Sequence, residues 1–72
     1  MIAIEIIGSG KRTRYAVKCV DERGTIPVDY KIYRTEEAAR RAASDLGFTV
    51  SAVGDIWQLM HVMHTSKREA VQ

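Results

Sequence analysis

Residues 2–20 read IAIEIIGSGKRTRYAVKCV, two alternating apolar runs joined by a glycine-rich turn. Isoleucine occupies every second position from residue 2 to residue 6, and residues 14–19 alternate in the same way. A period of two is typical of a β-strand with one buried face. Gly8 and Gly10 supply the positive φ that a tight turn between strands needs. The stretch therefore predicts an antiparallel hairpin, with the thiol of Cys19 on the buried face as a small hydrophobe.

A third alternating run follows at residues 28–33. Residues 21–24 have the composition of a turn, because they combine acidic side chains with a glycine. Pro27 suits the first residue of a strand, since that residue need not donate a hydrogen bond to the ladder. We therefore predict that residues 1–34 form a three-stranded antiparallel meander with one buried face.

Residues 35–47 have the pattern of a helix that packs on this sheet. Thr35 suits the N-cap, and the two glutamates after it suit the first turn, where the helix macrodipole favours acids. Gly47 suits the C′ position, with Phe48 available for the hydrophobic contact of a Schellman end. The inner face is rich in alanine, which implies a close approach to the sheet. The other side carries two i,i+4 pairs with the acid first, Glu36 with Arg40 and Glu37 with Arg41.

The last third of the chain contains a second predicted helix, over residues 55–68. Asp55 suits its N-cap, and apolar residues follow at spacings of 0, 3, 4 and 7. Trp57 and Val62 widen the apolar arc beyond what one core contact needs, which indicates a second surface buried against another chain. Residues 48–53 fit either a short fourth strand or an extended connection. The predicted partner or dimer interface is Ile56, Trp57, Met60 and Met63.

Length and composition indicate one α+β domain over residues 1–72. A chain of 72 residues is near the lower limit for folding on its own core, so idealised packing or oligomerisation must stabilise it. The single cysteine excludes an internal disulfide and suits a reducing cytosol. No targeting pattern and no apolar run of about 18 residues is visible, so we expect a cytoplasmic protein without a membrane partner.

Catalytic and metal chemistry find little support in the sequence. Gly10-Lys11 superficially resembles the end of a Walker A loop, but Glu5 stands where that loop needs its first glycine, and a strand follows instead of a helix. His61 and His64 could contact one metal ion, yet no third ligand has suitable spacing. A domain this small also struggles to enclose a substrate pocket. We therefore predict no enzyme activity, no catalytic residues, no metal and no cofactor.

Basic side chains dominate the first half of the chain. Residues 1–34 hold seven Lys and Arg against four Asp and Glu. Antiparallel sheets commonly leave one face in water, so these side chains fit either a solvated face or a binding surface. A binding surface of this kind suits a phosphate backbone or an acidic protein, and the sequence does not choose between them. The predicted basic face is Lys11, Arg12, Arg14, Lys18, Lys31, Tyr33 and Arg34.

The order of three strands and a helix that begins at residues 33–39, Tyr-Arg-Thr-Glu-Glu-Ala-Ala, resembles AP2-type and phage-integrase arm-binding domains over residues 13–47. That resemblance implies a three-stranded sheet that reads DNA. The chain departs from the pattern in two ways, because the hallmark tryptophans and glycines of AP2 domains are absent and an apolar tail follows the helix. The DNA contacts implied by the resemblance are Arg12, Arg14, Lys18 and Lys31.

The whole chain is also similar in size and style to small phage-encoded anti-defence proteins, notably anti-CRISPR proteins. The likeness implies a compact, often dimeric binder, and no residue roles come with it. Our leading expectation is a non-catalytic protein-binding inhibitor or adaptor of phage or mobile-element origin in the host cytoplasm, which either forms a homodimer or docks on its target through the C-terminal helix. It would act on a nucleic-acid-handling nucleoprotein complex such as a CRISPR effector. The alternative is a small DNA-binding protein that uses the basic face.

Overall fold

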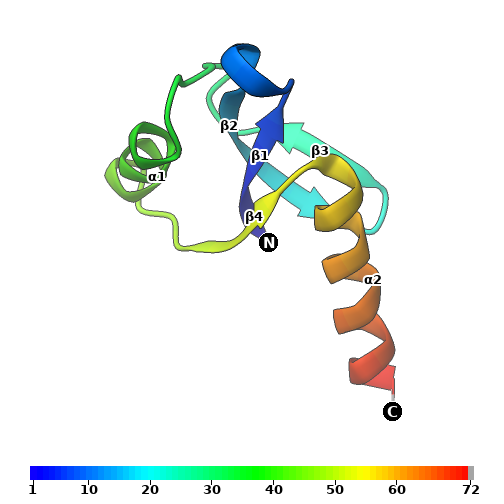
Figure 1. Cartoon of the computed structure of the whole chain (residues 1–72). Coiled ribbons are helices and arrows are strands. Elements are labelled where there is room, and N and C mark those ends of the chain that lie inside the picture. Colours follow the sequence, from blue (N-terminus) through cyan, green and yellow to red (C-terminus); the bar gives the residue numbers. More distant parts are fainter. Residues whose placement is uncertain (72) are drawn as a thin grey trace.

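A computed structural model describes the backbone of residues 1–71 and the side chains of residues 1–65. Four strands and two α-helices make up this part of the chain (Figure 1). A short 3₁₀ turn, η1 (Gly10–Arg12), separates the first two strands. The elements in chain order are β1 (Ile2–Ile7), β2 (Arg14–Asp21), β3 (Gly24–Pro27), α1 (Glu36–Asp45), β4 (Val50–Gly54) and α2 (Ile56–Val71).

The strands form one mixed sheet in the order β3-β2-β1-β4. β1 and β2 are antiparallel, with Ile2 opposite Cys19 and Ile7 opposite Arg14. β3 continues the antiparallel meander on one side, whereas β4 lies parallel to β1 on the other. The predicted α+β fold and meander are confirmed. The fourth strand, which the sequence predicted over residues 48–53 as an alternative to an extended connection, is present at Val50–Gly54.

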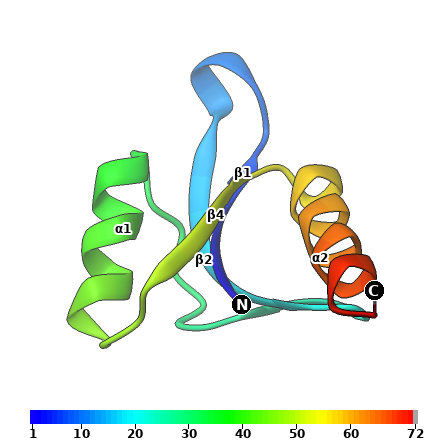
Figure 2. The same cartoon turned by 90° about the horizontal axis from the view of Figure 1, so that it is seen from below.

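The two helices lie on opposite sides of the sheet, with β1, β2 and β4 between them (Figure 2). Under α1, the buried residues Ile4 and Val17 of the strands contact Ala39 and Ala43 of the helix. Under α2, the buried cluster is formed by Ala3, Val20 and Leu59. The prediction that only one face of the sheet is buried is therefore wrong, because α2 covers the face that α1 leaves free.

The third strand lies earlier than predicted, at Gly24–Pro27 instead of residues 28–33. The side chain of Asp21 accepts hydrogen bonds from the amides of Arg23 and Gly24, at 2.8 and 3.1 Å, so the chain reverses at once. Pro27 therefore ends the strand and does not open it. Residues 28–33 form an irregular loop instead, in which Tyr30 adopts a positive φ of 60°.

Cys19 is exposed, so its predicted burial is also wrong. By strand alternation, its side chain lies on the same face of the sheet as that of Val17, the face that α1 covers. Cys19 itself lies between Ile2 and Ile26, and Ile26 is 59% exposed. The position lies outside the buried cluster beneath α1. Alternation identified the face of the sheet correctly but could not show how far along that face the helix reaches.

The predicted N-caps of both helices and the predicted C-terminal end of the first helix are confirmed, whereas the second helix extends to Val71 instead of residue 68. The hydroxyl of Thr35 accepts a hydrogen bond from the amide of Ala38. The Schellman end is complete, because Gly47 has a φ of 85° and the amide of Phe48 donates to the carbonyl of Ala43 at 2.9 Å. At the start of α2, Asp55 and Gln58 each accept a hydrogen bond from the other's amide, which is a capping box. The predicted Glu36–Arg40 and Glu37–Arg41 pairs are present as well.

The core is small. Eight hydrophobic residues are buried in the described part, and four of them are alanine. The large buried side chains are only Ile4, Leu59, Val17 and Val20. Since the free energy of folding depends mainly on the apolar area removed from water, a core of this size leaves a narrow margin over conformational entropy.

Candidate functional site

Four basic side chains gather at one end of the sheet, where β1 ends and β2 begins. Two of them lie in η1 between these strands, and Arg14 opens β2. Arg34 arrives from a distant part of the chain, because the adjacent Tyr33 exchanges two backbone hydrogen bonds with Tyr15, of 2.7 and 2.8 Å. We call this cluster the basic end; its members are Lys11, Arg12, Arg14 and Arg34.

The basic end lacks neutralising acids. Among the residues that the structure describes, none of its four side chains forms an ion pair. Arg14 instead directs its guanidinium at the carbonyl oxygens of Thr13 and Lys11, at 2.8 and 3.4 Å. Three cations outside the basic end are paired with acids: Lys18 with Glu5 at 3.8 Å, Arg40 with Glu36 and Arg41 with Glu37. Like charges at close range repel, so an anion that neutralises them would be bound favourably.

Two helix N-termini lie at the same end of the sheet. α1 begins just after Tyr33, which is bonded to the start of β2, and α2 begins two residues after Gly54, which lies opposite Glu5 near the end of β1. The macrodipole makes each N-terminus partly positive, although Asp55 and the acids of α1 offset part of this. Trp57, in the first turn of α2, is 81% exposed. The end therefore combines cations with an exposed aromatic ring.

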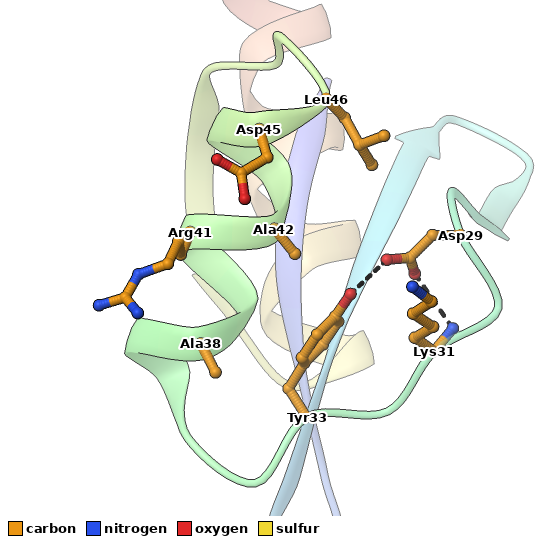
Figure 3. A pocket seen from close by; sticks show the side chains of 8 residues that line it. All are labelled: Asp29, Lys31, Tyr33, Ala38, Arg41, Ala42, Asp45 and Leu46. Carbon is orange, nitrogen blue, oxygen red and sulfur yellow. Dashed lines mark hydrogen bonds between the residues drawn. The ribbon is translucent and has the colours of Figure 1, made fainter.

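The other residues of the predicted basic face lie elsewhere. Lys18 is on the α2 side of the sheet, where it pairs with Glu5 and keeps only 16% of its side chain exposed. Lys31 and Tyr33 line a groove beside α1 (Figure 3). The structure thus brings together four of the seven predicted residues, and it does so at the end of the sheet and not across its face.

The groove beside α1 has a volume of about 400 Å³. Figure 3 shows the ring of Tyr33 between the alanines of α1 and the carboxylate of Asp29. Charges of both signs surround this apolar strip. The lining residues are Asp29, Lys31, Tyr33, Ala38, Arg41, Ala42, Asp45 and Leu46.

A hydrogen bond of 2.5 Å runs from the Tyr33 hydroxyl to Asp29. This bond, with smaller effects of burial and of the carboxylate charge, raises the pKa of Tyr33 to about 12. Burial raises the pKa of Asp29, but the bonds from Tyr33 and the Lys31 amide, with the Lys31 charge, outweigh it and leave that pKa lowered. Tyr33 therefore keeps its proton at neutral pH. Its hydrogen bond to Asp29 holds the loop of residues 28–33 against α1. Sequence reasoning missed this pair, since nothing in an irregular loop marks two residues as partners.

The predicted interface on α2 is largely used within the chain. Met60 and Met63 pack against the buried cluster of Ala3, Val20 and Leu59. Ile56 is half-buried. Only Trp57, together with Val62 at 40% exposure, remains outside the intramolecular contact. The wide apolar arc is thus explained mainly by the sheet face beneath it, for which the sequence left a solvated face and a binding surface open.

Among the described residues, no three His, Cys, Asp or Glu side chains come together as a metal site requires. His61 and His64 are both exposed on α2. No helix in the described part of the chain has the length and apolar character to span a membrane. Comparisons with protein-family models, with curated proteins and with solved structures found no match.

Proposed function

We propose that the chain is a non-catalytic nucleic-acid-binding module whose contact surface is the basic end together with Trp57. The observation that carries the proposal is the convergence at one end of the sheet of four cations, from η1, β2 and the segment before α1, that form no ion pair among the described residues. Lys and Arg clusters bind phosphate backbones and release counterions. An exposed tryptophan at the same end suits stacking on a base.

A second candidate function is the protein-binding inhibitor or adaptor that the sequence favours. The 81% exposure of Trp57 supports it, because buried tryptophans are frequent anchors of protein interfaces. Its other support is weaker than the sequence indicates, since Met60 and Met63 contact the sheet of their own chain. This candidate keeps its predicted target, a nucleic-acid-handling complex such as a CRISPR effector.

A fluorescence-anisotropy titration with labelled oligonucleotides, single-stranded and duplex, tests the first proposal. We expect binding at about 25 mM salt that weakens steeply toward 200 mM. Arg12→Glu and Arg34→Glu should each weaken binding and reduce the salt slope by roughly 0.9 or more, because each removes a phosphate contact.

Arg23→Glu is the matched control. It makes the same charge change in the turn between β2 and β3, at the opposite end of the sheet, and should leave the salt slope higher than in the other two variants. Absence of binding by the wild-type protein at low salt would leave the inhibitor candidate in first place. Equal losses in all three variants would show that only net charge matters and would remove the basic end as a site.

A further inference from the structure

The two edges of the sheet differ in how they are protected. β3, at one edge, is four residues long, follows the charged turn residues Glu22 and Arg23, and ends at Pro27. Short strands, charges and proline are the usual devices that prevent a sheet edge from pairing with another chain. The β3 edge has all three.

β4, at the opposite edge, has almost none of these devices. Residues 48–54 read FTVSAVG, without a charge or a proline. Its only strand partner is β1, and in residues 1–71 no other backbone hydrogen bond reaches it. Its protective features are a length of only five residues and a bulge at Ser51, where the register with β1 shifts. The outer edge of β4 is therefore an unpaired and uncharged template for another strand.

We propose that the outer edge of β4 pairs antiparallel with β4 of a second copy, about a two-fold axis perpendicular to the sheet. The result is a homodimer with one continuous sheet. An antiparallel ladder is self-complementary, so a strand can pair with its own copy without a new sequence. The axis also leaves α1 of both copies on one face of the sheet and α2 on the other.

The side chains next to β4 suit this partner. Phe48, which leads into the strand, is 40% exposed. Antiparallel pairing places the start of each β4 beside the end of the other, where α2 begins with Ile56. Apolar side chains from the two copies then face one another at both ends of the ladder. A second copy also supplies the burial that a core with only four large buried side chains lacks.

The bulge and the five-residue length of β4 limit the strength of the contact. Stable interfaces bury about 1,200–2,000 Å², and a ladder this short reaches the low end of that range only with its apolar flanks. We therefore expect a reversible dimer whose population depends on concentration. The inference is independent of nucleic-acid binding, because the basic end and β4 share no residue.

Sedimentation velocity on the wild-type protein over a wide concentration range is the direct test. The expected result is a rise from the 8.1 kDa monomer toward twice that mass as concentration increases. Ser51→Lys should raise the dissociation constant by roughly tenfold or more, because it places like charges on neighbouring strands at the edge. Ser51 is exposed, so the substitution should leave the monomer folded, as circular dichroism can check.

Ile26→Lys provides the matched control, since Ile26 is 59% exposed on the other edge strand. Its dimer population should equal that of the wild type. Hydrogen exchange adds a readout without mutation, because amides of β4 should gain protection as concentration rises while those of β3 do not. A wild-type monomer at about 1 mM, or a Ser51→Lys dimer as strong as the wild type, would overturn the proposal.

Discussion

The two faces of the sheet differ in whether the strands or the helix supply the large side chains of the core. On the α1 face the strands supply the large residues Ile4 and Val17, and the helix supplies Ala39 and Ala43. On the α2 face the bulk comes from the helix, in Leu59 and two methionines, over strand residues that include Ala3 and Ala52. A face with small strand residues is therefore not a face for solvent, because a helix with long side chains can cover it.

The largest expected effect comes from Leu59, which is fully buried at the centre of the α2 face. Leu59→Ala should lower the free energy of unfolding by about 2–5 kcal/mol, through lost transfer energy and the cavity left behind. Ile4→Ala on the α1 face should cost a similar amount. Urea denaturation monitored by circular dichroism measures both.

Val62→Ala is the control for this comparison, because Val62 lies on the same helix but is 40% exposed. Its cost should stay below about 1 kcal/mol. If Leu59→Ala were no more destabilising than Val62→Ala, α2 would not be packed on the sheet, and the comparison of the two faces would fail.

A smaller effect should follow from adding bulk to the alanine side of the α1 face. Ala43 is fully buried against the strands, so Ala43→Leu should destabilise the fold by about 1–3 kcal/mol through overpacking. Ser44→Leu adds similar bulk at the neighbouring exposed position and should change stability by no more than about 0.5 kcal/mol. Thermal unfolding of the two variants distinguishes them. Equal stability would mean that α1 does not approach the sheet closely.

The α1 face could be predicted from the sequence. The alternating isoleucines mark the buried side of a strand, and the alanine-rich stripe marks the buried side of a helix. The α2 face was harder to predict. Glu5 and Lys18 alternate with small residues there, and that pattern is normal for a wet face, although the structure pairs the two charges with each other. The parallel pairing of β4 with β1 also has no local signal, since it joins residues about 50 positions apart.

The composition of the basic end also depends on contacts between residues far apart in the sequence, which local patterns do not reveal. Lys11, Arg12 and Arg14 were predicted together because they are close in sequence. Arg34 lies near them only because backbone hydrogen bonds connect Tyr15 with Tyr33. Lys18 lies apart from them and pairs with Glu5. Residue type predicted that a basic surface exists, but the position of the helices decides which cations it contains.

The smallest effect is a pH dependence confined to the α1 face. The pKa of Tyr33 is raised to about 12 from an ordinary value of 10.0. Because the folded value is the higher one, this contribution to stability is fully present below pH 10 and is lost as the pH rises toward 12. Asp29, whose pKa is lowered from 3.8, contributes above that pH and loses its contribution as the pH falls.

Tyr33→Phe should remove the alkaline dependence, which melting temperatures measured at pH 8 and pH 11 can show. Absorbance titration at 295 nm gives the same pKa directly, as the difference between the wild type and the variant. If the pKa of Tyr33 had its ordinary value, the hydrogen bond to Asp29 would not hold the loop of residues 28–33.

The central claim is that Trp57 and the basic end form one nucleic-acid-binding surface. Trp57 is the single tryptophan of the chain, so intrinsic fluorescence reports on that position alone. A titration with an unlabelled single-stranded oligonucleotide at low salt should quench the emission in a saturable way, as stacking on a base requires, and added salt should reverse it. Unchanged emission throughout the titration would contradict the claim.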